Sequence, residues 1–565
     1  VLLIAPTGTG KTEAAILPVL NNFMLMAEKP PGIKILYITP LRALNRDLME
    51  RLEWWCNRLD VRVAVRHGDT EVGERSKQAK SPPDMLITTP ETLQAILPGK
   101  RMRKHLASLR WVIVDEVHEL ACDKRGAQLT LALERLRRLT GREFQRIGLS
   151  ATLGNPEEAA RFLAGKNRPF KLVQAENLRK VEAWVESPTP TREDLARAEE
   201  ASLPPGTVAR LRRLMEACQH YRSTLVFTNT REHAEALTSN LKLLYPSLKV
   251  AVHHGSLSRE VRLDAEEKLK KGELQILVCT SSLELGIDIG AVDFVVQYHS
   301  PRQAVKLAQR LGRSGHRFGE TARGLILAAW PDDILEAAVL LRRTFEGELE
   351  PPTLHREALD VLAHQLAGLT LDEGGLVSLE EAYKVFRRAE PYASLPPEAF
   401  YQVAAQLEAE RKIRLRDGSL KARSPETYHY YFENLSTIPE VSSFLVVDYA
   451  GRRVGSLDQE FVARHARPGS QFILKGSVWR VLQVDEDRRL VEVEASELSP
   501  AAIPAWEGEV IPVTFEAALE VGRLRRLILE DLEAGGGGFK PLEGYPLSPE
   551  AKAKVVDLVR AQREK

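Results

Sequence analysis

Residues 5–12 combine the residue types that bind the phosphates of a nucleotide. They read Ala-Pro-Thr-Gly-Thr-Gly-Lys-Thr directly after an apolar run, with Ala5 where the usual first glycine of such a loop stands. The glycines let backbone N–H groups face phosphate oxygens, Lys11 adds a positive charge near the β- and γ-phosphates, and Thr12 can ligate Mg²⁺. The nucleotide contacts are expected from Thr7, Gly8, Thr9, Gly10, Lys11 and Thr12.

Two adjacent carboxylates end another apolar run. Residues 112–119 place Asp115 and Glu116 at a strand end, where buried charges need a partner or a task. Asp115 is suited to a Mg²⁺ shell shared with Thr12, and Glu116 to orienting and deprotonating an attacking water molecule. Two such carboxylates can also simply face solvent, but the phosphate loop in the same chain favours hydrolysis of a nucleoside triphosphate.

Short apolar runs separated by helical stretches must position these groups. Runs buried on both faces are typical of parallel sheets covered by helices. A first set of strands is predicted at residues 33–39, 85–88, 111–115 and 147–150. A second set is predicted at residues 223–228, 248–253, 274–280, 292–298 and 324–330. We therefore expect two α/β domains in tandem, with residues 186–206 as an exposed connector or surface helix.

The pattern changes after about residue 350. Helices are predicted at residues 357–369 and 397–412, with another beginning at a capping box formed by Ser378 and Glu381. Asp417 and Gly418 signal a hairpin, so this region is expected to be a winged helix. Strands at residues 444–447, 471–474, 478–484 and 490–493 predict a small antiparallel β-domain, followed by a glycine break at 535–538 and a helix at 548–564.

Composition limits the classes of function. The 79 Lys and Arg residues balance 78 Asp and Glu residues, so a nucleic-acid site must be a local groove. The cysteines are far apart and form no CxxC pair, which argues against structural zinc, an Fe–S cluster or disulfides and favours a reduced cytoplasmic protein with the cysteines mostly in its cores. They are Cys56, Cys122, Cys218 and Cys279. The sequence predicts no membrane span or signal peptide, and its start at Val1 is expected to reflect a fragment.

Further segments follow the order of motifs in superfamily 2 helicases. Residues 114–118, Val-Asp-Glu-Val-His, resemble the DExH form of motif II, and residues 150–152, Ser-Ala-Thr, resemble motif III. The other matches are residues 39–44 and 88–92 for the strand-gripping motifs, 225–231 for motif IV, 280–290 for motif V and 309–317 for motif VI. The resemblance covers residues 1 to about 330 and implies an ATP-dependent motor with Mg²⁺.

This resemblance implies roles for individual residues. Asp288 would contact the ribose beside Gly286, and Arg313 would be an arginine finger, which in related reactions is worth ~10³–10⁵ in rate. Either His316 or Arg317 would be the second finger. Coupling of hydrolysis to movement is expected from His118, Ser150, Thr152 and Gln309. Contacts with the nucleic-acid backbone are expected from Arg42, Thr89, His254 and Thr280.

Residues beyond 330 decide the branch of the superfamily. Three segments resemble the Lhr family, the large helicase-related proteins: residues 430–439, 451–458 and 503–509. The resemblance implies two RecA-like domains, a winged helix and a β-rich fourth domain, at residues 1–170, 171–345, 346–428 and 429–565. It also implies a monomeric, 3′-to-5′ translocase on single-stranded DNA that unwinds DNA or RNA:DNA duplexes in bacterial or archaeal DNA repair.

Two tryptophans and the winged helix allow more than one interpretation. Trp506 stands in a loop-like setting, where stacking on a base would contribute ~1–3 kcal/mol and could wedge a duplex open, although it could instead pack the fourth domain. For Trp479, inside a predicted strand, core packing is favoured.

The acidic helix at residues 398–410 does not suit a major groove, so the winged helix is expected to be a scaffold.

Two other motor classes share this ATPase pair. A protein-translocating motor of the SecA type needs a large clamp insertion, for which residues 11–152 leave no room. An RNA-duplex opener of the DEAD-box type would carry Asp in place of His118 and His in place of Gln309. A binding module with an inactive ATPase is disfavoured because the chain retains Lys11, Asp115, Glu116 and Arg313.

Overall fold

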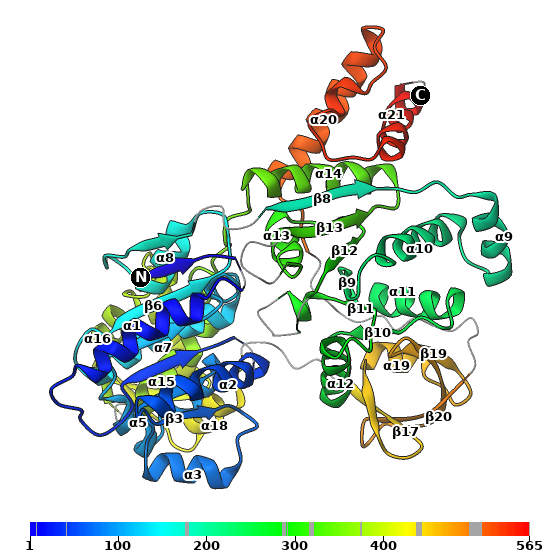
Figure 1. The fold of residues 1–565 in the computed structure, drawn as a ribbon. Coiled ribbons are helices and arrows are strands. Elements are labelled where there is room, and N and C mark those ends of the chain that lie inside the picture. Colours follow the sequence, from blue (N-terminus) through cyan, green and yellow to red (C-terminus); the bar gives the residue numbers. More distant parts are fainter. Residues whose placement is uncertain are drawn as a thin grey trace. The chain divides into compact units, whose positions relative to one another are not determined.

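The computed structural model describes residues 1–6, 8–40, 42–175, 180–284, 290, 292–315, 321–372, 376–436, 443–496 and 511–563, without the side chains of 42–47 and 50. The chain forms two compact units (Figure 1). The first comprises Val1–Ala5, Thr9–Glu176 and Pro351–Pro439, and the second comprises Pro6–Gly8, Asn177–Glu350 and Glu440–Lys565.

A seven-stranded parallel sheet forms the centre of the first unit, in the order β3-β4-β2-β5-β6-β1-β7. Its strands are β1 (Leu2–Ile4), β2 (Ile35–Ile38), β3 (Val63–Arg66), β4 (Met85–Thr88), β5 (Trp111–Val114), β6 (Gln145–Ser150) and β7 (Leu172–Gln174). Its helices are α1 (Lys11–Met24), α2 (Arg42–Arg58), α3 (Val72–Lys80), α4 (Pro90–Ile96), α5 (Lys100–Leu106), α6 (Val117–Ala121), α7 (Lys124–Thr140) and α8 (Pro156–Ala164). The central strands β2, β4 and β5 are buried throughout, which confirms the predicted parallel-sheet domain.

The winged helix belongs to the same unit. It contains α15 (Leu359–Asp372), β14 (Leu376–Ser378), α16 (Leu379–Phe386), a 3₁₀ turn at Glu390–Tyr392, α17 (Pro397–Ala409), β15 (Ile413–Arg416), β16 (Ser419–Ala422) and α18 (Glu426–Glu433). The predicted hairpin is confirmed, because Asp417 and Gly418 both have positive φ, 47° and 70°, as a two-residue turn of this type requires. One bond of the predicted capping box is present, since the Ser378 side chain accepts a hydrogen bond from the backbone of Glu381.

A fully buried polar network fastens the winged helix to the first sheet's helices. Arg135 of α7 donates two hydrogen bonds to Asp372 of α15, at 2.7 and 2.9 Å, with both side chains at least 97% buried. Its other contacts are with Gln94, Gln365 and Tyr431. A Cβ atom at Gly368 would lie only 2.4 Å from the Tyr431 ring. This packing joins the winged helix to the first parallel sheet through α7.

The second unit is built on a six-stranded parallel sheet in the order β10-β11-β9-β12-β13-β8. Its strands are β8 (Val181–Glu186), β9 (Thr224–Phe227), β10 (Val250–His253), β11 (Ile276–Cys279), β12 (Phe294–Tyr298) and β13 (Ala322–Leu327). Its helices are α9 (Arg192–Ala201), α10 (Pro205–Cys218), α11 (Arg231–Leu244), α12 (Arg259–Lys270), a 3₁₀ turn at Ser281–Leu283, α13 (Ala304–Leu311) and α14 (Pro331–Glu346). The surface helix expected within residues 186–206 is α9, which begins with a capping box of Thr191 and Asp194.

A five-stranded sheet completes the second unit, in the order β18-β17-β21-β20-β19. Its strands are β17 (Ser443–Asp448), β18 (Arg453–Asp458), β19 (Gln471–Leu474), β20 (Ser477–Asp485) and β21 (Leu490–Ala495). Helix α19 (Gln459–His465) connects β18 to β19. The expectation of a purely antiparallel domain is wrong, because β17 and β21 pair in parallel. The long connection between these two strands permits that arrangement, which a tight hairpin would not.

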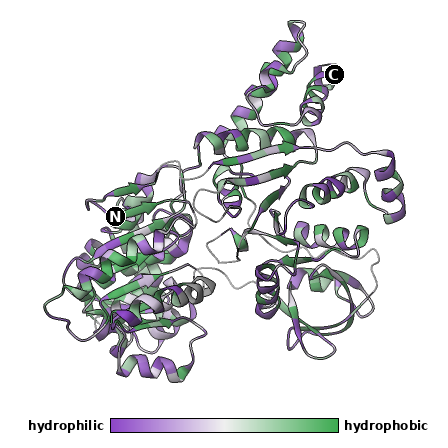
Figure 2. Ribbon diagram, viewed as in Figure 1, coloured by the Kyte–Doolittle hydropathy of each residue, from purple (hydrophilic) through white to green (hydrophobic). Residues whose placement is uncertain are grey.

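Helices α20 (Phe515–Glu533) and α21 (Pro549–Arg563), joined through a 3₁₀ turn at Lys540–Leu542, pack against α14. The predicted last helix is thus α21, whereas α20 was not predicted. Figure 2 shows apolar residues along the strands of both parallel sheets, where the cores lie.

Two predicted domain limits need correction. The first sheet extends to Gln174, because β7 pairs with β1, so the limit at residue 170 is too early. The limit between residues 428 and 429 falls inside α18, whose Tyr431 is part of the buried network of the winged helix.

Of the cysteines, three are buried and Cys122 is exposed. None of the described helices is long and apolar enough to cross a membrane.

Candidate nucleotide site and the residues around it

The predicted phosphate loop joins β1 to α1. Gly8 and Gly10 have φ of 75° and 83°, a left-handed conformation that favours glycine. Helix α1 begins at Lys11, so its first N–H groups are available to an anion, and Lys11 Nζ donates to the Ala5 carbonyl across 2.5 Å. Thr7 lies outside the described residues. The loop therefore has the backbone form that phosphate binding requires.

The two carboxylates lie at the same edge of the sheet. Asp115 follows β5, and its backbone N–H donates to the Ile38 carbonyl across 2.8 Å. The Tyr37 hydroxyl donates to Asp115 Oδ2 across 2.8 Å, and the Glu116 N–H donates to Oδ1 across 2.9 Å. The Thr12 side chain lies beside the Tyr37 hydroxyl, where it opposes the rise in the pKa of Tyr37 that burial and Asp115 cause. The structure thus brings Thr12 and Asp115, which were predicted as Mg²⁺ ligands, onto one tyrosine.

The electrostatics of this edge favour a cation. Burial and the adjacent charge of Glu116 raise the pKa of Asp115 to about 7, although the Tyr37 hydroxyl and Lys11 oppose that change. Glu116 is itself 6% exposed and has a left-handed backbone, φ 48°, which is costly for this residue. Hydroxyl and carboxylate oxygens are the hard donors that Mg²⁺ prefers, so the residues present fit this ion.

His118 connects Glu116 with the end of β6. Its Nδ1 accepts a hydrogen bond from the Ala151 N–H at 3.2 Å and lies 3.2 Å from Ser150 Oγ. Glu116 Oε2 is 3.6 Å from the same nitrogen. Because Nδ1 is an acceptor, the neutral ring carries its proton on Nε2, toward Glu119. Among the residues with predicted coupling roles, His118 and Ser150 are in contact, and Thr152 follows them directly in the chain.

In the second unit, Arg313 is 1% exposed and donates to the Glu284 carbonyl across 2.6 Å. Its neighbour Arg310 is fully buried and donates to the Glu284 carboxylate at 2.5 and 2.7 Å. Burial raises the pKa of Glu284, but the charges of Arg310 and Lys306 outweigh burial and lower it. No local sequence pattern predicts this ion pair, although both residues stand inside predicted motifs. Gln309 is 8% exposed beside them on α13, whereas Gly286, Asp288, His316 and Arg317 lie outside the described residues.

The predicted nucleic-acid contacts are less well placed. Thr89 is the N-cap of α4, where its side chain accepts a hydrogen bond from the Thr92 N–H, and Thr280 precedes a 3₁₀ turn; both are buried. The Arg42 side chain and Trp506 lie outside the described parts of the structure. Trp479 packs against the core and donates from Nε1 to the Leu474 carbonyl across 2.7 Å, in agreement with the core interpretation.

The expectation that His254 grips a phosphate backbone is corrected by its surroundings. The ring is fully buried, donates from Nε2 to Glu235 across 2.7 Å and accepts at Nδ1 from the Ser256 N–H. Glu235 also accepts hydrogen bonds from the backbone N–H groups of Lys475 and Gly476. His254 therefore helps to hold the five-stranded sheet against the second parallel sheet.

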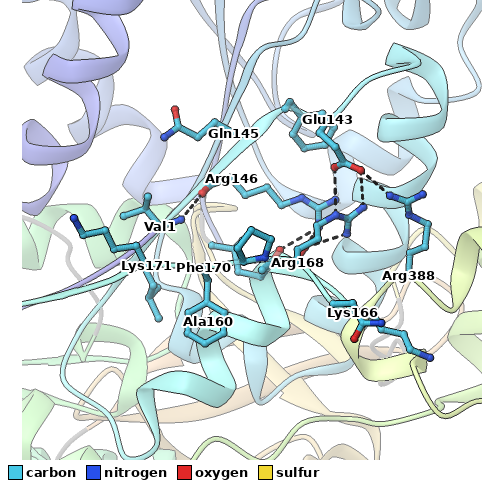
Figure 3. A pocket seen from close by; sticks show the side chains of 16 residues that line it. Val1, Glu143, Gln145, Arg146, Ala160, Lys166, Arg168, Phe170, Lys171 and Arg388 are labelled. Atoms are coloured by element: carbon cyan, nitrogen blue, oxygen red, sulfur yellow. Dashed lines mark hydrogen bonds and ion pairs between the residues drawn. The ribbon is translucent and has the colours of Figure 1, made fainter.

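A cavity of about 780 Å³ lies at the opposite edge of the first sheet (Figure 3). It is lined by the start of β1, the start of β6, the end of α8 and Arg388. Its arginines are paired with carboxylates, since Glu143 binds both Arg168 and Arg388. Because parallel strands begin here and the phosphate loop follows their ends, this cavity is separate from the nucleotide edge.

Matches to known protein families identify the class of protein to which the chain belongs. Residues 1–159 match the DEAD/DEAH box helicase family, and residues 206–319 match the helicase conserved C-terminal domain. Residues 342–500 match the winged helix domain of large helicase-related proteins. Together with the two parallel sheets, these matches identify an ATP-dependent superfamily 2 helicase core.

The closer relatives identify the family. ATP-dependent helicase Lhr-Core protein 2 of Thermococcus barophilus is 38% identical over the whole chain, which spans 68% of that protein. Lhr helicase/uracil glycosylase of Escherichia coli is 35% identical over 90% of the chain, which spans 38% of that protein. Among solved structures, the chain resembles that of Mycobacterium smegmatis helicase Lhr bound to single-stranded DNA and AMP-PNP, with 33% identity and a TM-score of 0.74. The match covers all of this chain and 70% of the Mycobacterium chain. The chain belongs to the Lhr family.

The chain spans only 62–64% of four other archaeal Lhr-Core proteins that it matches. The predicted fold class, with two RecA-like domains, a winged helix and a β-rich region, agrees with the Mycobacterium structure.

Proposed function

We propose that the chain is an ATP-driven translocase that moves 3′ to 5′ along single-stranded DNA and unwinds DNA or RNA:DNA duplexes. The observation that carries the proposal is the meeting of the phosphate loop with Asp115 and Glu116 at one edge of the first sheet. The DNA track is supported by the single-stranded DNA in the structure of the Mycobacterium relative. A role in DNA repair, a monomeric state and a cytoplasmic location belong to the same proposal.

In the proposed hydrolysis, Lys11 and the N–H groups of the loop hold the phosphates. Glu116 orients the attacking water molecule and takes its proton. Thr12 and Asp115 would hold Mg²⁺, which when bound neutralises charge on the phosphate oxygens. Arg313 adds positive charge in the transition state, with His316 or Arg317 as the second finger, and Asp288 and Gly286 contact the nucleotide.

Movement along the strand requires that ATP binding and hydrolysis change the position of the residues that hold the strand. The contact of Glu116 with His118, and of His118 with Ser150 and Ala151, offers such a route within the first unit. Thr152 and Gln309 are proposed to contribute to it. Arg42, Thr89 and Thr280 would contact the phosphate backbone, which carries no sequence information, so binding should not depend on sequence. Trp506 would stack on a base.

Strand displacement from tailed duplexes tests the polarity and the duplex. With ATP, a duplex carrying a single-stranded 3′ DNA tail should be unwound, and one carrying a 5′ tail should not. Each tailed substrate is made as a DNA:DNA and as an RNA:DNA duplex, so that the assay shows which of the two duplexes the protein unwinds. Equal unwinding from both tails would contradict the polarity. Replacement of Trp506 by Ala should weaken unwinding without unfolding the protein.

A further inference from the structure

Tyr37 is a polar residue in an otherwise apolar, fully buried strand. Its neighbours along β2 are Ile35, Leu36 and Ile38, and its exposed fraction is 0%. A tyrosine buried in this way needs a partner for its hydroxyl, because an unsatisfied polar group in a core is costly. Here the hydroxyl donates to Asp115 Oδ2 at 2.8 Å, and the Thr12 side chain lies beside it.

The sheet fixes where that hydroxyl lies. Strand β2 pairs directly with β5, with Tyr37 opposite Ile113, so the ring reaches Asp115 from the adjacent strand. Thr12 approaches from α1, the helix that follows the phosphate loop. One hydroxyl therefore joins groups from three separate elements: a loop-helix junction, a central strand and the end of the next strand.

Tyr37 also completes the orientation of the carboxylate. The Glu116 N–H holds Asp115 Oδ1 at 2.9 Å, and the Tyr37 hydroxyl holds Oδ2. With one donor on each oxygen, the carboxylate plane is set before any ligand arrives. Without the hydroxyl, Asp115 Oδ2 would lose this donor, and Thr12 would lose its polar neighbour on β2.

We propose that Tyr37 is a positioning residue that holds Thr12 and Asp115 in the arrangement needed for a Mg²⁺-nucleotide complex. The inference rests on the proposed function, since it assumes that these two residues ligate the ion. Hydrogen-bonding partners behind metal ligands commonly change metal affinity by about 10–100-fold when they are removed. Tyr37 would thus act on nucleotide binding through Thr12 and Asp115 without touching the nucleotide.

Equilibrium binding of a fluorescent ADP analogue, titrated with MgCl₂, tests this role without relying on turnover. Tyr37→Phe removes only the hydroxyl. We expect the Mg²⁺ concentration at half-maximal binding to rise about tenfold, while binding in EDTA stays at the wild-type level. Tyr392→Phe is the matched control, because Tyr392 is equally buried in the same unit but donates to the Ala358 carbonyl, across 2.9 Å.

Three results overturn the inference: an unchanged Mg²⁺ midpoint in Tyr37→Phe, an equal change in both variants, or an equal loss of binding with and without Mg²⁺. Thermal unfolding of the two variants checks that they are folded to the same extent. Failure of the proposed function looks different, because the wild-type protein itself would then show no Mg²⁺-dependent nucleotide binding.

Discussion

The backbone N–H of Ala151 donates to Nδ1 of His118 across 3.2 Å. This bond sets the tautomer of a ring whose same nitrogen lies 3.6 Å from the Glu116 carboxylate. A carboxylate predicted to position the attacking water and the turn after β6 therefore share one imidazole. Any change in the position of Glu116 during hydrolysis has a direct path to that turn.

Replacing His118 by Ala should uncouple unwinding from hydrolysis. The Ala151 N–H would lose a buried acceptor, and the link to Glu116 would be gone. We expect the number of base pairs unwound per ATP to fall about fivefold or more, with ATP hydrolysis less affected. Paired ATPase and strand-displacement assays measure the ratio. His105→Ala, which removes a histidine bonded to the Ala79 carbonyl in the same unit, is the control; an equal ratio in both variants would contradict the coupling role.

Replacing Glu116 by Gln should separate binding from hydrolysis. The amide keeps the size of the side chain but cannot take a proton from water. We expect the turnover rate to fall by about 10²–10⁴, while nucleotide affinity is retained because a neighbouring negative charge is removed. Single-turnover hydrolysis and equilibrium binding on the same preparation check both parts. Turnover near the wild-type rate would exclude Glu116 as the base.

Arg310 should matter for stability in a way that surface ion pairs do not. The side chains of Arg310 and Glu284 are at least 99% buried, so Arg310→Ala would remove the closest cation from a buried carboxylate and leave it with the more distant Lys306, at 3.2 Å. We expect a loss of about 3–5 kcal/mol in the free energy of unfolding. Denaturant unfolding measures it. Lys268→Ala, which breaks an exposed pair with Asp264, should stay within about 0.5 kcal/mol of wild type. Similar midpoints for the two variants would show that the buried pair is not needed.

His364 should make the first unit sensitive to acid. Its Nε2 donates to the Tyr431 carbonyl across 3.0 Å, and its Nδ1 accepts from the side-chain amides of Gln365 and Gln128, so only the neutral ring fits. Burial and then the charge of Arg135 lower the pKa of His364 to about 4. The unfolded chain takes up this proton below pH 6.5 while the folded chain does not, so stability falls as the pH drops from 6.5 toward 4.

The integrated effect of His364 is about 3 kcal/mol. In His364→Asn the slope of unfolding free energy against pH in that window should be smaller than in wild type, because the variant has no proton to take up there. Replacement of the exposed His220 by Asn is the control and should leave the slope unchanged. Parallel slopes for wild type and His364→Asn would refute the prediction. Urea titrations at half-unit pH steps provide the data.

Features encoded in short, continuous patterns could be predicted from the sequence. The phosphate loop, Asp115 with Glu116, and the Asp417-Gly418 turn each depend on neighbouring residues, and each lies where it was expected. The buried strands followed from apolar runs for the same reason, whereas the more exposed strands β3, β7 and β8 were not predicted. The sheet order then brought the first two motifs together, as the ends of parallel strands share one edge.

Features that depend on distant partners could not be predicted in this way. Tyr37 reads as one more strand residue until the pairing of β2 with β5 places it against Asp115. His254 reads as a candidate contact until helix α11 places Glu235 against its ring. The link from Arg135 to Asp372 joins residues 237 positions apart, a separation at which no local pattern reports contact.

We propose above all that this chain hydrolyses ATP in response to single-stranded DNA. The most direct test is the steady-state ATPase rate with single-stranded DNA, with single-stranded RNA of the same sequence and with no polymer, for wild type and Glu116→Gln. We expect single-stranded DNA to raise the rate well above that in the other two conditions, and Glu116→Gln to abolish it. A wild-type rate indifferent to DNA, or one that survives in Glu116→Gln, would contradict this proposal.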